Sequence, residues 1–278
     1  MRSMASSSSS KGIAAIVGVG PNLGRSIARK FAHEGYVVAI LARDLGRLSR
    51  FADEIAREEK AQVFAIRIDC SDSRSIREAF EGVLSLGFVE VLVYNAYQPV
   101  PWHPSNFSDL RVDSFEKSLA VSTVGAFHCA QQVLPGMVER GRGTILFTGC
   151  SASLKGIAGF SELCCGKFAL RALSQCLARE FQPVGVHVAH IIIDGVVGPP
   201  RLASSHALIA FWLIHSNQIL SSRDLFCPFR ALKKAAFMCC VFHGYGIIQR
   251  FSITRLFSTY ILIVELEIEE TSSVCLLG

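Results

Sequence analysis

The stretch Ile13–Ala28, IAAIVGVGPNLGRSIA, decides the fold of this chain. A short apolar run leads into Gly18, Gly20 and Gly24, and a helical pattern begins among these glycines. Glycines at such a turn let the backbone bend tightly and approach a phosphate group, while the amides that open the next helix point at the negative charge. Because the glycines stand between a first strand and a first helix, the stretch predicts a dinucleotide-binding loop.

Apolar, β-branched runs alternate with amphipathic stretches from this loop onward. The expected strands are Ile13–Val17, Val37–Leu41, Val63–Ile68, Val89–Val93, Thr144–Thr148 and Val186–Ile193. The expected helices are Leu23–His33, Leu45–Glu59, Arg74–Leu86, Val112–Arg140 and Phe160–Gln182. This alternation predicts an α/β fold with a single domain, in which a doubly wound, Rossmann-like parallel sheet carries helices on both faces.

The two ends of the chain differ from this regular part. Residues 1–11 are rich in serine and are expected to be disordered, residues 12–200 form the dinucleotide-binding domain, and residues 201–278 form an irregular tail. Between Arg201 and Val264 there are seven Lys or Arg but one acidic residue, and no clean period persists. The tail is either a loosely patterned helical segment with an edge strand at Tyr260–Ile268, or a variant tail that is no evolved partner of the sheet.

Composition narrows the function classes. A length of 278 residues suits one large α/β domain, and a net charge of +5 is too small and dispersed to indicate nucleic acid. The ten cysteines show no CxxC or metal-ligand spacing, so no metal site is expected. Cys129 and Cys176 lie in apolar runs and are expected to be small buried thiols, which favours a reducing compartment.

No membrane segment is expected either. The longest apolar run, Ala207–Ile214, is too short to span a bilayer, so we expect a soluble, cytoplasmic protein. The serine-rich start, which has one arginine and no acidic residue, leaves import into an organelle as an alternative.

The residues after the second and third strands indicate which dinucleotide is bound. An acidic residue after the second strand would accept the ribose hydroxyl of NAD, but here Arg43 can pair with the phosphate of NADP. The alternative is a helix-start arginine that pairs with Asp44. Asp69 closes the third strand where adenine would lie, although Ser71 or Asp72 could also cap the next helix there. We therefore expect NADP(H) to be preferred over NAD(H).

These features, in this order, resemble the short-chain dehydrogenase/reductase family from residue 12 to about residue 200. The resemblance rests on the glycine loop, on Asn95 and Ala96 after the fourth strand, on the helix that contains Ser122, and on Lys167. It implies that the cofactor is bound over the carboxyl edge of the sheet, and that copies of the chain assemble through the fourth and fifth helices. The expected cofactor-binding residues are Gly18, Gly20, Asn22, Leu23, Gly24, Arg43, Asp69, Asn95, Ala96 and Lys167.

The same resemblance exposes a departure in the catalytic residues. In the family, a tetrad of Asn, Ser, Tyr and Lys carries the chemistry, and the tyrosine gives the proton. Matched by position, this chain has Ser122, Cys150, Leu163 and Lys167, so only the lysine is kept. Since leucine cannot transfer a proton, the candidates for the remaining catalytic roles are Lys167, Cys150, the neighbouring Ser151, and Tyr97.

Three functions are therefore possible. The first is an NADP-linked oxidoreductase that moves hydride to or from a small carbonyl or alcohol with a substituted proton path. The second is an NADP(H)-binding scaffold or sensor without turnover, and the third is a truncated isoform without activity of its own. The substrate itself is not encoded in any motif of the chain.

Overall fold

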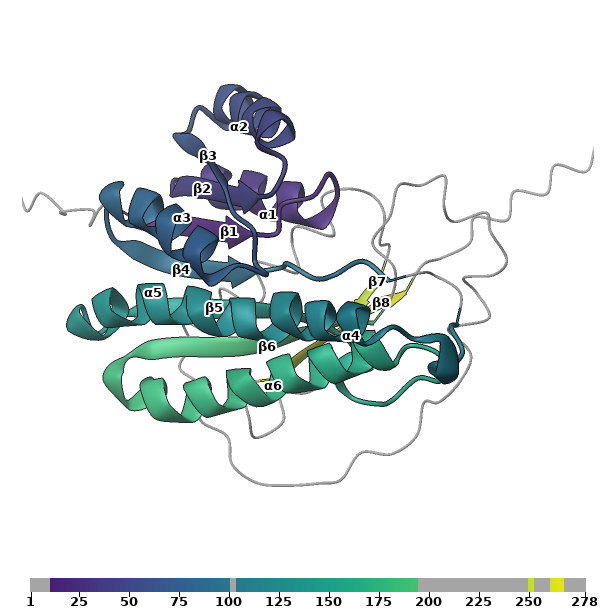
Figure 1. Cartoon of the computed structure of the whole chain (residues 1–278). Helices are drawn as coiled ribbons and strands as arrows, with labels where there is room; N and C mark the ends of the chain where they lie inside the picture. Colours follow the sequence, from purple (N-terminus) through teal and green to yellow (C-terminus); the bar gives the residue numbers. More distant parts are fainter. Residues whose placement is uncertain (1–10, 101–103, 195–249, 253–260, 268–278) are drawn as a thin grey trace, which may run out of the picture.

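The computed structural model of the chain describes residues 11–100, 104–194, 250–252 and 261–267. Strands and helices alternate along it and build a layered α/β fold (Figure 1). The strands of the regular part are β1 (Ile13–Val17), β2 (Val37–Ala42), β3 (Val63–Arg67), β4 (Val89–Tyr94), β5 (Gly143–Cys150) and β6 (Val186–Asp194). All six predicted strands are confirmed, with ends that move by at most two residues.

Helices connect these strands. They are α1 (Leu23–His33), α2 (Leu45–Glu59), α3 (Ser73–Ser85), α4 (Val112–Leu119), α5 (Gly125–Glu139) and α6 (Ser161–Phe181). Short helical turns are η1 (Phe107–Asp109), η2 (Ala120–Val124), η3 (Ser151–Ser153) and η4 (Gln182–Val184).

The sheet has the order β3-β2-β1-β4-β5-β6-β8-β7, in which β1 to β6 and β8 run parallel. β8 (Ile261–Glu267) pairs with β6, and β7 (Arg250–Ser252) pairs antiparallel with β8. A strand is thus confirmed within Tyr260–Ile268, but β7 lies outside it, so the prediction of an edge strand was wrong. The division at residue 200 stays a prediction, because most of the tail and residues 1–10 lie outside the described residues.

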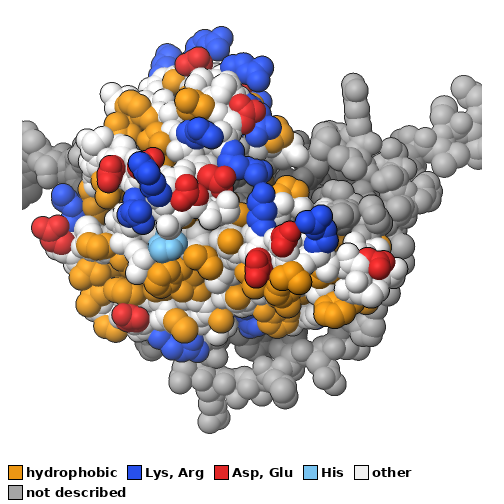
Figure 2. Space-filling view, viewed as in Figure 1, with side chains coloured by type: hydrophobic (Ala, Val, Ile, Leu, Met, Phe, Trp, Pro, Cys, Tyr) orange, Lys and Arg blue, Asp and Glu red, His pale blue; other side chains and the backbone are white. Residues whose placement is uncertain are grey.

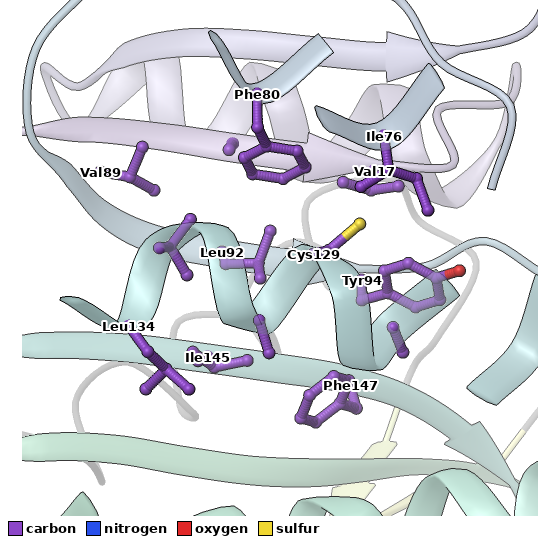
Figure 3. Packing of buried hydrophobic residues seen from close by; sticks show 14 of the residues in the cluster. Val17, Ile76, Phe80, Val89, Leu92, Tyr94, Cys129, Leu134, Ile145 and Phe147 are labelled. Carbon is purple, nitrogen blue, oxygen red and sulfur yellow. The ribbon is translucent and has the colours of Figure 1, made fainter. Parts of the chain in front are cut away.

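The sheet is buried on both faces, as expected for a parallel sheet covered by helices. Along β1, Ile13, Ala15 and Val17 pack with α3, α5 and α6, while Ala14 and Ile16 pack with α1 and α2. Figure 3 shows the first of these two cores, in which side chains of α3 and α5 meet those of the central strands. The doubly wound architecture follows from this alternation.

One predicted helix contains a π-helical turn, although its helical backbone continues without a gap. The stretch predicted as a single helix, Val112–Arg140, consists of α4, a π-helical turn η2 and α5. The hydroxyl of the fully buried Tyr94 donates to the carbonyl of Val121 inside η2, and the Thr123 hydroxyl donates to the carbonyl of Gly166 at 3.1 Å. Because both contacts come from other elements, the local helical pattern could not predict this turn.

Two thiols also differ from each other. Cys129 is buried, as predicted, and burial raises its pKa well above the ordinary value. Cys176 is exposed on α6, so the prediction that it is buried was wrong. Both are free thiols, and an apolar run in sequence does not show which face of a helix points outward.

Candidate functional site

The glycine loop lies where the chain changes direction in the sheet. β1 has β2 on one side and β4 on the other, so the strand order reverses here, and sheets of this kind bind ligands at the carboxyl edge of such a point. Gly18 has φ of +86°, and a Cβ there would lie 2.4 Å from the amide nitrogen of Ala96. The amide group of Asn95 donates to the carbonyl of Gly18 at 3.0 Å, which ties the two loops together.

The geometry of the loop fits a dinucleotide phosphate. A Cβ on Gly20 would meet no atom within 4 Å, so open space lies beside this glycine. A Cβ on Gly24 would lie 2.7 Å from Cα of Val19, so α1 packs closely on the loop. Asn22 caps α1 without a side-chain hydrogen bond, which leaves the first-turn amides of α1 free of that side chain. Its φ of −99° means that the tolerance of asparagine for left-handed backbone is not used.

Arg43 and Asp69 lie together at the adenosine end. Asp69 accepts hydrogen bonds from the hydroxyl and the amide of Ser71 at 2.7 and 2.9 Å. These bonds lower the pKa of Asp69, and the charge of the exposed Arg43 adds to the effect. Asp44 does not hold Arg43: its carboxylate accepts from the Arg47 amide at 3.0 Å and caps α2. Asp72, not Ser71, caps α3, as one alternative predicted.

Lys167 is the central residue at the other end of the site. It lies on α6, is 5 % exposed, and its Nζ donates to the carbonyl of Thr148 on β5 at 2.8 Å. Burial lowers its pKa, and the Cys150 thiol acts in the opposite direction. The ring of Tyr97, on the loop after β4, has its centroid 6.0 Å from Nζ. Lys167, Cys150 and Tyr97 are therefore gathered at one place on the carboxyl edge.

The other tetrad positions lie around this lysine without a phenol among them. Leu163 is partly buried and packs, together with Cys150, against an apolar cluster of Ala152, Phe160 and Cys164. Ser122 is buried in η2. A Cβ on Gly166 would lie 3.0 Å from Cβ of Ser122, so η2 and α6 pack closely at this glycine.

Ser151, the remaining candidate, begins η3 at the end of β5. Its carbonyl accepts from the amide of Leu154 at 2.9 Å, and its side chain is partly exposed. The catalytic parts of Lys167, Cys150, Ser151 and Tyr97 stay predictions.

A buried histidine lies behind the site. His190 on β6 is 1 % exposed, and its Nε2 is 3.0 Å from the hydroxyl oxygen of Ser153 in η3. Burial, with a contribution from the Lys167 charge, lowers the pKa of His190 to about 3. A Cβ on Gly149 would lie 2.1 Å from Nε2, so the glycine in β5 makes room for the ring. A glycine inside a strand often marks a close approach of this kind.

The described part of the chain offers neither a metal-binding cluster nor a membrane-spanning helix. Within the described residues, no three His, Cys, Asp or Glu side chains come together in a way that could hold a metal ion. None of the helices in this part of the chain combines the length and the apolar character needed to cross a bilayer.

The chain is similar to known proteins over the part that forms this site. Residues 12–205 match the family model described as short chain dehydrogenase. The 3-ketodihydrosphingosine reductase of Bos taurus is 29 % identical over 181 residues, which cover 62 % of this chain and 53 % of the relative. The chain thus spans about half the length of that relative. A short-chain dehydrogenase/reductase of Armillaria gallica is 31 % identical over 192 residues, which cover 66 % of this chain and 71 % of the relative.

Solved structures agree with these matches. An alcohol dehydrogenase from the archaeon Thermococcus sibiricus, solved in complex with 5-hydroxy-NADP, is 26 % identical with a TM-score of 0.62. The match covers 69 % of this chain and 83 % of that structure. With the glycine loop, the sheet order and Lys167 in place, the chain belongs to the short-chain dehydrogenase/reductase family.

Proposed function

We propose that the chain binds NADP(H) and transfers hydride between this cofactor and a small carbonyl or alcohol substrate. The observation that carries the proposal is the open space beside Gly20, next to the first-turn amides of α1 and on the same sheet edge as Lys167. Relatives named as reductases and dehydrogenases support the reaction class, and a similar structure in complex with an NADP derivative supports the cofactor.

The residues of the site divide the work. The pyrophosphate lies in the space beside Gly20 and accepts hydrogen bonds from the amides of Leu23 and Gly24. Arg43 pairs with the additional phosphate of NADP, and Asp69 contacts the adenosine end. Asn95 and Ala96 contact the middle of the cofactor. The cofactor, when bound, supplies or accepts the hydride. Lys167 holds the nicotinamide ribose, because it lies beside Cys150 and Tyr97 at this end of the site. The side chains of Cys150 and Ser151 orient the substrate oxygen.

Tyr97 is the proposed proton donor. Its side chain is half exposed and its ring lies 6.0 Å from Nζ of Lys167, so it is the phenol that the described residues place beside this lysine. A tyrosine hydroxyl at this place could give its proton to the substrate oxygen.

Leu163 favours a second candidate function. Since three of the four tetrad positions have changed, the chain could hold NADP(H) without turnover, as a scaffold or sensor. Both candidates share the cofactor site and differ in whether NADPH is consumed when a carbonyl compound is present. We place the protein in the cytoplasm, where the free thiols of the described cysteines would stay reduced.

NADPH binding tests the shared part of the proposal. We expect calorimetry to show tight binding of NADPH and weaker binding of NADH to the purified full chain. Arg43→Ala should weaken NADPH binding by about 10- to 100-fold, the loss expected for a hydrogen bond between charged groups, and NADH binding by less than about threefold. Arg50→Ala, an exposed arginine on α2, is the matched control and should change neither. Equal losses for both cofactors in Arg43→Ala would refute the assignment.

A further inference from the structure

Two cysteines from different elements come together at the candidate site. Cys150 ends β5 and is partly exposed, whereas Cys164 lies in the first turn of α6 and is 5 % exposed. Cys164 forms an apolar cluster with Ala152 and Phe160, and Cys150 packs against this cluster. The two thiols are also near enough for the charge of Cys150 to raise the pKa of Cys164. The fold therefore pairs an accessible thiol with an enclosed one.

Cys150 has the surroundings of a reactive cysteine. Its Sγ accepts a hydrogen bond from the amide of Ser153, at the start of η3. The buried ammonium group of Lys167 lies close enough for its pKa to respond to the charge of this thiol. A backbone donor and a cation both stabilise the negative sulfur of a thiolate, which is the form that reacts with oxidants. Because the residue is partly exposed, a molecule as small as hydrogen peroxide can approach it.

Cys164 has the surroundings of a second, slower thiol. Its Sγ accepts a hydrogen bond from the amide of Ile157 at 3.3 Å, which fixes the sulfur beside the loop between β5 and α6. Burial raises the pKa of Cys164, the Ile157 amide lowers it, and the charge of Cys150 raises it again. Cys164 thus remains a thiol while Cys150 meets the oxidant. When Cys150 becomes a neutral sulfenic acid, its charge disappears and the Cys164 thiolate forms more easily.

We propose that Cys150 and Cys164 form a reversible disulfide when hydrogen peroxide reaches the site. The Cys150 thiolate attacks one oxygen of the peroxide, the O–O bond breaks, hydroxide leaves, and Cys150 becomes a sulfenic acid. The Cys164 sulfur then attacks the Cys150 sulfur, the S–O bond breaks, and the hydroxyl group leaves as water with the proton of Cys164. Two thiols are oxidised by two electrons in total, and one peroxide is reduced to two waters.

The disulfide would change the site in two ways. It removes the Cys150 thiol, which we proposed to orient the substrate oxygen, and it ties the end of β5 to the helical turn that leads to Lys167. Dithiol reductants would restore both thiols, as is usual for a disulfide that forms in a reducing compartment. The loss of turnover in the oxidised chain rests on the proposed function, whereas the formation of the disulfide does not.

Trypsin places the two cysteines on separate peptides, which makes the test direct. Residues 143–155 contain Cys150, and residues 156–167 contain Cys164. The full chain is reduced, freed of reductant, treated with hydrogen peroxide, alkylated, digested and analysed by mass spectrometry. We expect the two peptides to be joined with the loss of two hydrogen atoms, and dithiothreitol to separate them. Oxidised peptides that are not joined would overturn the inference.

Substitutions identify the bridged sulfurs. Cys164→Ser should abolish the cross-link and let dimedone, a reagent that traps sulfenic acids, label Cys150. Cys165→Ser is the matched control and should keep the cross-link, because Cys165 is the exposed neighbour on the same peptide. Cys150→Ser should also abolish the cross-link, and it decides the matter if Cys164→Ser does not fold. A cross-link that survives Cys164→Ser, or one that is lost in Cys165→Ser, would overturn the inference.

NADPH binding separates this inference from the proposed function. NADPH is titrated into the reduced samples: NADPH binding without the cross-link would overturn the inference and leave the proposed function standing. A cross-link without NADPH binding would support the disulfide and count against the proposed function. With a ketone that the reduced chain turns over, peroxide should stop turnover and dithiothreitol should restore it. Full turnover by a completely cross-linked chain would show that the disulfide does not control the site.

Discussion

At the scale of single residues, the chain keeps the cation of the family site and loses its phenol. The Nζ group of Lys167 is enclosed and donates to Thr148, and burial lowers the pKa of the lysine. With Leu163 one helical turn before it, this lysine has no phenol to activate from its own helix. The ring centroid of Tyr97, on the loop after β4, lies 6.0 Å from the same ammonium group. Turnover thus depends on whether a residue from another element can replace the lost proton donor.

Tyr97→Phe tests this replacement. The variant keeps the ring beside Lys167 and removes only the hydroxyl, so NADPH affinity should stay within about threefold. With a ketone that the wild-type chain reduces, kcat should fall by about 100-fold or more, the usual contribution of a positioned proton donor. Adding Leu163→Tyr to Tyr97→Phe should restore part of the rate, since residue 163 lies one turn from Lys167 on α6. An unchanged kcat in Tyr97→Phe would remove Tyr97 from the mechanism.

At the scale of elements, β5, η3 and β6 are joined behind the site. Nε2 of His190 is paired with the Ser153 hydroxyl, and the Cys150 amide donates to the same hydroxyl oxygen at 3.2 Å. The ring of His190 occupies the space left by Gly149, so the three elements fit only with a glycine at that place. The pair therefore fixes the turn that carries Cys150 and Ser151, and it does so with a neutral imidazole.

This neutral imidazole makes stability depend on pH. His190 has a pKa of about 3 in the folded chain and an ordinary pKa of 6.5 when unfolded, so the unfolded chain binds more protons as pH falls below 6.5. Its contribution to stability is complete above that pH and is lost as pH falls toward 3. Between pH 7 and pH 5 the free energy of unfolding should drop by about 2 kcal/mol.

Urea unfolding at pH 5, 6 and 7 measures this drop. In His190→Gln most of this drop in the free energy of unfolding should be absent, because glutamine takes up no proton in this range. The variant should also be less stable than the wild type at pH 7. His128→Gln on α5 is the control and should keep the drop. The bonds that lower the pKa of Asp69 act at more acidic pH, so they do not obscure the result. A wild-type chain with equal stability at pH 5 and pH 7 would contradict the neutral state of His190.

At the scale of the whole molecule, sequence patterns predicted the features that depend on residues close together in the chain. The strands, most helix ends and the glycine loop follow from apolar period and glycine placement, and they were found at the expected residues. The turn η2 depends on Tyr94, 27 residues away in the chain, and the segment before α6 is held by the amide of Ser105, which donates to the carbonyl of Gly159. Contacts between distant segments have no local signal, and the site is made largely of such contacts.

The assembly of whole molecules is the last prediction. Hydrophobic side chains gather over α5 and α6 on the face shown in Figure 2, and Val124, Phe127 and Phe168 are 49, 42 and 40 % exposed. These helices belong to the fourth and fifth helices predicted from the sequence, Val112–Arg140 and Phe160–Gln182. We expect two copies of the chain to pack them together, as the family resemblance implies, because an apolar surface of this kind favours association. In a two-fold interface each substitution occurs twice, once from each copy.

Phe127→Asp tests this interface, since it places two like charges in a surface that the dimer would bury. The dissociation constant of the dimer should rise at least about 100-fold, because like charges brought together cost several kcal/mol. Light scattering after size-exclusion chromatography should show a dimer or larger assembly for the wild type and a monomer for the variant at the same concentration. Phe64→Asp, at the exposed edge strand β3, is the control and should leave the assembly intact, because β3 lies at the far end of the sheet from α6. A monomeric wild type, or an assembly that survives Phe127→Asp, would show that α5 and α6 do not form the interface.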